Sequence, residues 1–338
     1  MGQEPLKKER SRIVRDTFNE MASEYDDLSD LWYQYTFSSI DEVILHELRP
    51  SSDISGKPIA LDVGCGTGIQ SLRLASLGYR VLGVDIADRL LVRARRKLAE
   101  ADYADADFMI ADAQSLPLDD NVAHCVNCCG PTLSFIPDWR DTLTEVSRCL
   151  KPGGKLLLEV EGKWNLDLFW EIANALGFNF LGYDESLLTA LSHLLPPWRL
   201  GHTIDYSFKS SSDASVSMPL RLFTAVELGE ELQSRGLAEE KRWGLHVTTN
   251  LIPSTILHKV NPSRPLTIIF RALARLEKKV NGRWPPNALG CSLLVLARKK
   301  QHCPDSTEGG NRPSSKSSQL MIARNSHMSV RKAEQLLV

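Results

Sequence analysis

A glycine-rich turn constrains the fold of this chain more than any other feature. Residues 60–68 read Ala-Leu-Asp-Val-Gly-Cys-Gly-Thr-Gly, with glycines at three alternate positions after a short apolar run. The run predicts a strand over 58–63, and the residues beyond the turn predict a helix over 69–77. Glycine tolerates positive φ and lets a ligand approach the backbone closely, and the free N–H groups at a helix N-terminus suit an oxygen-rich ligand. The turn therefore predicts a nucleotide-type site at the end of a strand.

Beyond this turn, apolar runs alternate with amphipathic stretches. Strands are expected over 79–85, 107–111, 123–129, 155–160, 239–248 and 290–297, and helices over 87–101, 139–150 and 225–234. Apolar strands joined through helices form a parallel sheet that is buried on both faces. The sequence therefore predicts a doubly wound α/β fold.

The regions outside this alternation divide the chain into parts. N-terminal helices (1–50) are expected to cover the ligand site, which belongs to a ligand-binding core (51–160). A cap insertion (161–220) follows, and then the rest of the core (221–298), which contains a second insertion at 249–288. The last part is a disordered basic tail (299–338). Helices are expected over 11–26, 38–48, 165–183 and 185–195, and an antiparallel strand pair over 202–209 and 216–223. The tail is assigned from its Ser, Gly and Asn content, its lack of periodicity and its excess of Lys and Arg.

The spacing of the glycines narrows the class of ligand. The pattern is G-x-G-x-G, whereas dinucleotide-binding folds carry G-x-G-x-x-G, and no Lys-Ser/Thr pair follows as it does in a P-loop. Asp62 lies two residues before Gly64, where its carboxylate is expected to face the cationic end of the ligand. A ligand with an ammonium group and a sulfonium is therefore favoured over one with a pyrophosphate.

Two further acids follow predicted strands. Asp85 ends the second strand, at a position where a carboxylate can accept both hydroxyls of a ribose. Alternatively, it caps the helix that begins near Ala87, and one side chain can do both. Asp112 ends the third strand, where its side chain can bind an adenine amino group and the backbone N–H of Ala113 a ring nitrogen.

Taken together, the runs 60–68, 83–85, 111–114 and 150–154 resemble the four signatures of class I S-adenosylmethionine-dependent methyltransferases, in order and at the expected separations. The resemblance covers about residues 15–160 and 221–298. It is greatest for the branch that contains quinone-biosynthesis enzymes and many small-molecule methyltransferases. It implies a Rossmann-like seven-stranded sheet with an antiparallel last strand and S-adenosylmethionine as the methyl donor.

The resemblance and the motif positions together give a set of expected cofactor-binding residues. They are Tyr25, Asp62, Gly64, Cys65, Gly66, Gly68, Asp85, Ile86, Asp112, Ala113 and Cys129. Tyr25 is included because N-terminal helices in relatives close over the donor and an aromatic face attracts a sulfonium. The chain departs from the family at Ala123-His124, where Phe-Asp is frequent. It also lacks the Asn/Asp-Pro-Pro-Tyr signature of amino-methylating enzymes.

Methyl transfer from a sulfonium needs few catalytic groups, because the leaving group is already good. The protein chiefly aligns the nucleophile, and such positioning supplies roughly 7–11 kcal/mol. A general base is needed only where the acceptor is protonated at neutral pH. Glu161, His202 and His246 are candidates for that base, and the sequence favours none of them.

The expected function is methyl transfer to a small, apolar or aromatic acceptor through O, C or N, since the predicted cap is rich in aromatic residues. Two alternatives remain: a methyltransferase of RNA or protein, and a catalytically silent module that binds S-adenosylmethionine. A nicotinamide-dependent oxidoreductase is disfavoured by the glycine spacing. The oligomeric state stays open.

Composition bounds the partners and the compartment. The net charge is −2, so no nucleic-acid partner is expected. There are seven cysteines, several of them inside apolar runs, and no long apolar run, which together favour a reducing, cytoplasmic location without a membrane span. The C-x-x-C-C run at 125–129 falls on a buried strand, so no metal site is expected. Residues 263–279 are basic and amphipathic, which fits either peripheral membrane contact or a solvated helix face.

Overall fold

The computed structural model of the protein describes residues 3–23, 25–26, 30–177, 181–183, 186–209, 215–259 and 261–301. The chain divides into two units, Met1–Lys300 and Gln301–Val338. Every helix and strand described below lies in the first unit. The predicted disordered tail lies outside the described residues, apart from its first three positions.

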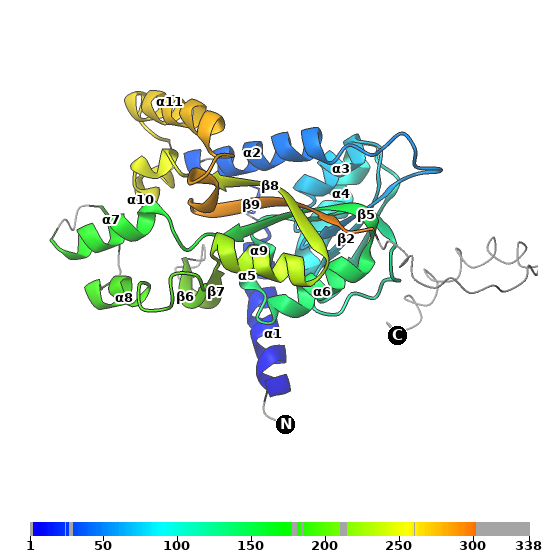
Figure 1. Ribbon diagram of the computed structural model, residues 1–338, viewed down its shortest axis with the longest axis horizontal. Helices are drawn as coiled ribbons and strands as arrows, with labels where there is room; N and C mark the ends of the chain where they lie inside the picture. The colour runs from blue at the N-terminus through cyan, green and yellow to red at the C-terminus, as the bar shows by residue number, and fades with distance from the viewer. Residues whose placement is uncertain are drawn as a thin grey trace, which may run out of the picture. The chain divides into compact units, whose positions relative to one another are not determined.

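A seven-stranded sheet forms the centre of the first unit (Figure 1). Its strands are β1 (Ile59–Val63), β2 (Arg80–Asp85), β3 (Ala106–Ile110), β4 (Ala123–Cys128), β5 (Leu150–Glu161), β8 (Leu237–Leu245) and β9 (Ser292–Lys299). Their order is β3-β2-β1-β4-β5-β9-β8. The first five strands run parallel, and β9 is antiparallel to both of its neighbours. The predicted doubly wound, Rossmann-like fold with an antiparallel last strand is confirmed.

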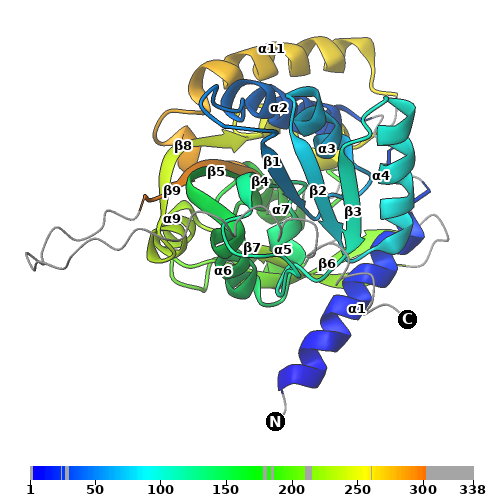
Figure 2. The same cartoon turned by 90° about the vertical axis from the view of Figure 1, so that its right-hand side faces the viewer.

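Helices cover both faces of this sheet (Figure 2). One face is covered by α2 (Leu31–Glu47), α3 (Ile69–Ser76) and α4 (Asp88–Glu100), and the other by α5 (Thr132–Phe135), α6 (Trp139–Cys149) and α9 (Ala225–Ser234). Each helix turns an apolar stripe to the sheet, as Ile40 and Ile44 of α2 do on the first face and Leu228 and Leu232 of α9 on the second. The sheet is therefore buried on both sides, which explains its long apolar strands.

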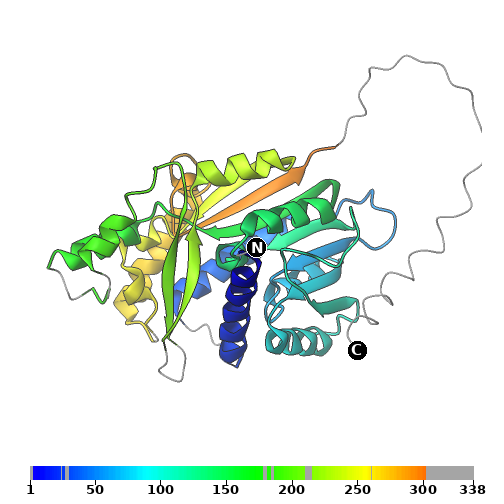
Figure 3. The same ribbon diagram turned by 90° about the horizontal axis from the view of Figure 1, so that it is seen from below.

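The remaining elements lie outside this core. They are α1 (Gln3–Met21), α7 (Leu166–Ala175), α8 (Leu187–Ser192), the hairpin β6 (His202–Lys209) and β7 (Ser215–Leu222), η1 (Thr249–Leu251), α10 (Ser254–Leu257), α11 (Arg264–Val280) and η2 (Pro286–Ala288). The hairpin lies beside α1, where Val14 packs against Met218 and Leu220 (Figure 3). The N-terminal helix is thereby held against an element from the middle of the chain.

Several element boundaries differ from the sequence prediction. Helix α2 begins at Leu31, seven residues before the expected start, because Asp30 accepts a hydrogen bond from the backbone N–H of Tyr33 at 2.8 Å and caps the helix there. The aromatic residues 32–37 are therefore helical. Strand β5 begins at Leu150, and its register with β4 shifts beside the Lys-Pro-Gly-Gly run. Helix α7 ends at Ala175, well before residue 183, and Gly177 follows with a φ of +127°.

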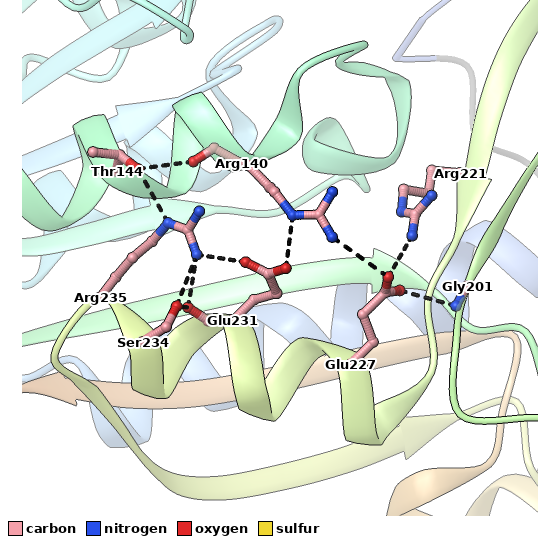
Figure 4. Close-up of polar contacts among 8 residues, drawn as sticks. All are labelled: Arg140, Thr144, Gly201, Arg221, Glu227, Glu231, Ser234 and Arg235. Carbon is pink, nitrogen blue, oxygen red and sulfur yellow. Dashed lines mark hydrogen bonds and ion pairs between the residues drawn. The ribbon is translucent and has the colours of Figure 1, made fainter.

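A network of ion pairs joins the hairpin to the core through α9 (Figure 4). The buried Glu227 carboxylate accepts hydrogen bonds from Arg221 Nη2 at 2.5 Å and from the backbone N–H of Gly201 at 3.0 Å. One turn further along α9, Glu231 pairs with Arg140 and Arg235 at 2.7 and 2.6 Å. Glu227 is therefore the point where α9 holds both ends of the β6–β7 hairpin.

Candidate active site

The glycine turn connects β1 to α3 and is tied to β2. The backbone N–H groups of Gly64 and Cys65 donate to the carbonyl of Val84 at 2.8 and 3.0 Å. Gly64, Gly66 and Gly68 have φ values of +67°, +53° and +79°, a region that non-glycine residues rarely adopt. The turn thus requires glycine at all three positions on backbone grounds.

The three glycines also differ in what surrounds them. A Cβ on Gly64 would lie 2.3 Å from the Thr132 side chain, and one on Gly68 would press on α4 at 3.0 Å. Next to Gly66 the nearest atom is a carbon of the Tyr25 ring, 3.7 Å away. Gly64 and Gly68 therefore serve close packing, whereas Gly66 leaves its space open beneath Tyr25.

Asp85 lies at the carboxyl end of β2, against this turn. One carboxylate oxygen accepts the backbone N–H of Gly66 at 2.8 Å, and the other accepts that of Ala87 at 2.8 Å. Burial raises the pKa of Asp85, and these backbone donors oppose that shift. Both sequence interpretations remain compatible with this geometry, since each oxygen keeps a second lone pair for a ligand while the carboxylate also supports the start of α4.

Asp112 follows β3 and holds the loop that leaves it. Its Oδ1 accepts the backbone N–H and the side-chain amide of Gln114, both at 2.9 Å. The other end of the Gln114 amide accepts the backbone N–H of Asp138 at 3.3 Å. Asp112 and Ala113 are thereby fixed beside the segment that follows α5.

The N-terminal segment covers these loops. Asp26 accepts hydrogen bonds from Thr67 Oγ1 at 2.6 Å and from Lys97 Nζ at 3.1 Å. The neighbouring Tyr25 packs edge-on against Phe18, with ring centroids 6.2 Å apart. Because Thr67 belongs to the glycine turn and Lys97 to α4, this tether places the Tyr25 ring over the turn.

A pocket lies among these elements, at the carboxyl ends of the first three strands. It encloses about 700 Å³ of space, including the part open to solvent. Of the expected cofactor-binding residues, those that line it are Tyr25, Gly64, Gly66, Asp85, Ile86, Asp112 and Ala113. These seven residues come from distant parts of the sequence, and the fold brings them to one cavity.

Four expected residues do not line this pocket. Cys65 and Cys129 are buried side chains, and Gly68 faces α4. The Asp62 carboxylate, expected to face the ligand, is buried and accepts hydrogen bonds from Ser71 Oγ at 2.5 Å and Asn127 Nδ2 at 2.8 Å. Burial raises its pKa to about 6. Because it lies on an internal strand beneath the turn, Asp62 joins β1 to α3 and β4 and does not reach the cavity.

Sequence reasoning missed much of the pocket wall. Ser11, Val14 and Phe18 line it from α1, at spacings of three and four residues that place them on one helix face. The sequence predicts a helix over this stretch, but the apolar spacing does not show which side faces the ligand. Thr132 and Phe135 line it from α5, a four-residue helix with no periodic signal.

A group of titratable side chains includes Glu161 at the end of β5, whose backbone N–H donates to Ser134 Oγ of α5 at 2.9 Å, between the pocket residues Thr132 and Phe135. Burial, and then Glu159 and Asp167, raise the pKa of Glu161 to about 8. Burial raises the pKa of Tyr33, with Tyr206 and Glu161 adding to the shift, and the pKa of Tyr206 is raised by burial and then by Glu161. The pKa of Glu161 is therefore near neutrality, and the hydroxyls of Tyr33 and Tyr206 lie close enough to interact with its charge.

The two histidine candidates have different surroundings. His246 is fully buried and stacks on Trp32 with ring centroids 3.6 Å apart, and its ring nitrogens bond to Thr36 and Thr249 at 2.8 and 3.0 Å. It is a packed core side chain. Burial and then His193 lower the pKa of His202 to about 4, too low for an efficient base at neutral pH. Of the three candidates, Glu161 best fits a base.

Replacing Glu161 by glutamine is expected to remove one contribution by which stability falls as the pH rises between about pH 4.5 and 8, so the slope of stability against pH becomes more positive. The unfolded state loses this proton near pH 4.5, whereas the folded state keeps it to about pH 8, so stability falls as pH rises through that window. Urea unfolding at pH 5, 6.5 and 8 measures the slope. As a control, Glu145→Gln removes a carboxyl whose pKa Arg148 holds low, so it should leave that slope unchanged. Equal slopes in wild type and Glu161→Gln would contradict the expectation.

Within the described ranges, no three His, Cys, Asp or Glu side chains are grouped so as to bind a metal ion. None of the helices in the described part of the chain has the length and apolar character needed to cross a bilayer.

Comparison with known proteins agrees with this geometry. Residues 61–158 match the methyltransferase domain family. The [4+2]-cyclase SpnF has a TM-score of 0.52 and 18% sequence identity over 86% of this chain and 97% of that one, which shows a common fold. The Rossmann-like sheet and the glycine turn therefore agree with the match of residues 61–158 to the methyltransferase domain family.

The chain is similar to proteins named demethylmenaquinone methyltransferase. A demethylmenaquinone methyltransferase of Shouchella clausii is 30% identical over 151 residues, which is 44% of this chain and 62% of that protein. Its counterpart in Symbiobacterium thermophilum is 30% identical over 165 residues, which is 46% and 61% of the two chains. The chain spans about three fifths of the length of these relatives.

Proposed function

We propose that the protein is an S-adenosylmethionine-dependent methyltransferase that acts on a small, apolar or aromatic acceptor. The observation that carries this proposal is the convergence of Gly66, Asp85 and Asp112 on one pocket beneath Tyr25. The match of residues 61–158 to the methyltransferase domain family supports it.

The residues of the pocket fit the methyl donor. Asp85 would accept the ribose hydroxyls, and Asp112 with the N–H of Ala113 would hold the adenine. Gly66 leaves room at the turn because it has no Cβ, and the rings of Tyr25 and Phe18 present apolar walls suited to a sulfonium. When bound, the donor supplies an electrophilic methyl group on sulfur.

The group around Glu161 is proposed as the acceptor side of the site. Burial and neighbouring charges raise the pKa of Tyr25, which lines the donor pocket, and Tyr25 in turn is one of the groups that act on Tyr33. The acceptor would thus lie between the donor pocket and Glu161, enclosed by Tyr33 and Tyr206. The Glu161 carboxylate would take the proton of an acceptor O–H or activated C–H, because its pKa of about 8 lies near the operating pH.

The relatives suggest the kind of acceptor. The proteins of Shouchella clausii and Symbiobacterium thermophilum are named demethylmenaquinone methyltransferases. An aromatic, apolar molecule with an acidic proton suits the tyrosines around Glu161. The proposal includes a cytoplasmic location. The six cysteines in the described residues are buried and form no disulfide, which supports a reducing compartment.

The test is a transfer assay on the full chain with methyl-labelled S-adenosylmethionine and a fractionated extract of its source. Label in the low-mass or organic-soluble fraction is the expected result, and Glu161→Gln should lower the rate by about 10²-fold or more if an acceptor proton is removed. Label confined to RNA or protein would overturn the substrate class and leave the donor site standing. Donor binding without transfer in any fraction would instead indicate a catalytically silent module.

A further inference from the structure

Helix α11 lies on the outside of the molecule, across α2 (Figures 1 and 2). Its inner side is firmly anchored, because Phe270 and Glu277 are buried. The Glu277 carboxylate accepts the backbone N–H groups of His246, Thr248 and Thr249 at 2.7, 2.9 and 3.0 Å. The rotation of α11 about its own axis is therefore fixed, and its opposite side faces outward.

That outward side carries large apolar residues. Ile268, Ile269 and Leu276 are 69%, 54% and 48% exposed. With Ala272, also exposed, they follow helical spacing and form one stripe. A helix packed on one face normally places polar residues on the other, so this stripe is an apolar surface without a partner.

The same side is strongly basic. Arg264, Arg271, Arg275 and Lys279 are exposed, and no ion pair holds any of them within the part of the chain that the structure describes. The helix has one acid, Glu277, and it belongs to the inner side. The charged residues on the outer side of α11 are therefore all cationic, although the chain as a whole has a net charge of −2.

One more exposed apolar residue lies next to the helix. Leu251 in η1, which packs against α11, is 54% exposed. Trp284, four residues beyond the end of the helix, is 82% exposed, but it lines a second pocket with residues of α9 such as Val226 and is not counted as part of this surface.

We propose that the outer side of α11 docks on a membrane surface that contains anionic lipid. Ile268, Ile269 and Leu276 would enter the boundary between headgroups and acyl chains, and the arginines would contact the phosphates. A nucleic acid would use the charges but leave the isoleucines in water, which is why the combination favours lipid. The surface is separate from the donor pocket, so this proposal does not depend on the proposed function.

The experiment is co-sedimentation of the full chain with vesicles of phosphatidylcholine alone or with about 30 mol% phosphatidylserine, at low and high salt. Binding to the anionic vesicles that weakens with salt is expected. Arg271→Gln/Arg275→Gln should lower the partition coefficient about thirtyfold, since each basic residue near such a surface contributes roughly fivefold. Ile268→Asn/Ile269→Asn should lower it at least about tenfold, with its residual binding more salt-sensitive.

A matched control removes two arginines elsewhere. Arg89→Gln/Arg96→Gln changes two exposed residues of α4 and should leave vesicle binding unchanged. All variants should keep the circular dichroism spectrum and the urea unfolding midpoint of the wild type, which shows that they fold. The proposal is overturned if the wild type does not bind anionic vesicles, or if the control variant weakens vesicle binding as much as the α11 variants do.

Discussion

Replacing Asp85 by alanine is expected to weaken the binding of S-adenosylhomocysteine by about a hundredfold or more, because hydrogen bonds to a charged group contribute about 1.5–3 kcal/mol each. The carboxylate would accept two ribose hydroxyls, and it also holds the backbone N–H groups of Gly66 and Ala87. Its loss removes ligand contacts and loosens the turn beneath the ligand. Titration calorimetry of the purified variant measures the effect.

Asp88→Ala is the matched control for this substitution. Asp88 is an exposed acid three residues further along the chain, bonded to Asn19 at 2.8 Å and outside the pocket wall. Its loss should change the affinity less than about threefold, as expected for a surface charge. If a folded Asp85→Ala protein bound S-adenosylhomocysteine with unchanged affinity, the assignment of the ribose to this carboxylate would be wrong.

Replacing Glu227 by alanine is expected to lower the free energy of unfolding by about 3 kcal/mol, because the substitution leaves a largely buried cation without its partner. The Glu227 carboxylate is 4% exposed and accepts from Arg221 and from the N–H of Gly201. The Arg221 side chain is only 16% exposed, so water replaces the lost contact poorly. Urea unfolding measures the loss, and hydrogen exchange should rise across β6 and β7.

Glu231→Ala, one turn along the same helix, gives the comparison (Figure 4). Its partner Arg140 is 54% exposed and can turn to solvent, while Arg235, which is 17% exposed, keeps hydrogen bonds to the Glu231 backbone carbonyl at 2.9 Å and to Thr144 Oγ1 at 3.1 Å. The expected loss is about 0.5–1 kcal/mol, as for surface ion pairs. Equal losses for the two variants would mean that burial does not distinguish the two ion pairs.

The core of the fold could be predicted because each of its strands is marked by local sequence. Runs such as 79–85 and 123–129 are mostly apolar, and each is followed by the turn or helix signals expected at a strand end. Helix boundaries were less accurate where a single hydrogen bond decides them. Asp30 caps α2, which begins seven residues before the start expected from sequence. The apolar periodicity used to predict helices does not indicate a single capping carboxylate.

Site residues could be predicted where the backbone conformation requires a particular residue type. They were harder to predict where the packing of the interior decides which way a side chain points. Gly66, Asp85 and Asp112 follow strand ends and line one pocket. Asp62 lies in the same motif, yet its side chain points into the interior, to Ser71 and Asn127. Adjacent strand residues face opposite ways, and a one-residue difference in position is enough to separate a ligand contact from a structural bond.

The pocket has a floor and a roof that come from separate stretches of the chain. The floor is formed by strand ends between residues 60 and 114, whereas α1 and Tyr25 supply the roof, and Asp26 ties this roof to the floor through Thr67 and Lys97. A ligand that touches both parts would add a second connection between them, so its binding is expected to lower hydrogen exchange in the first helix.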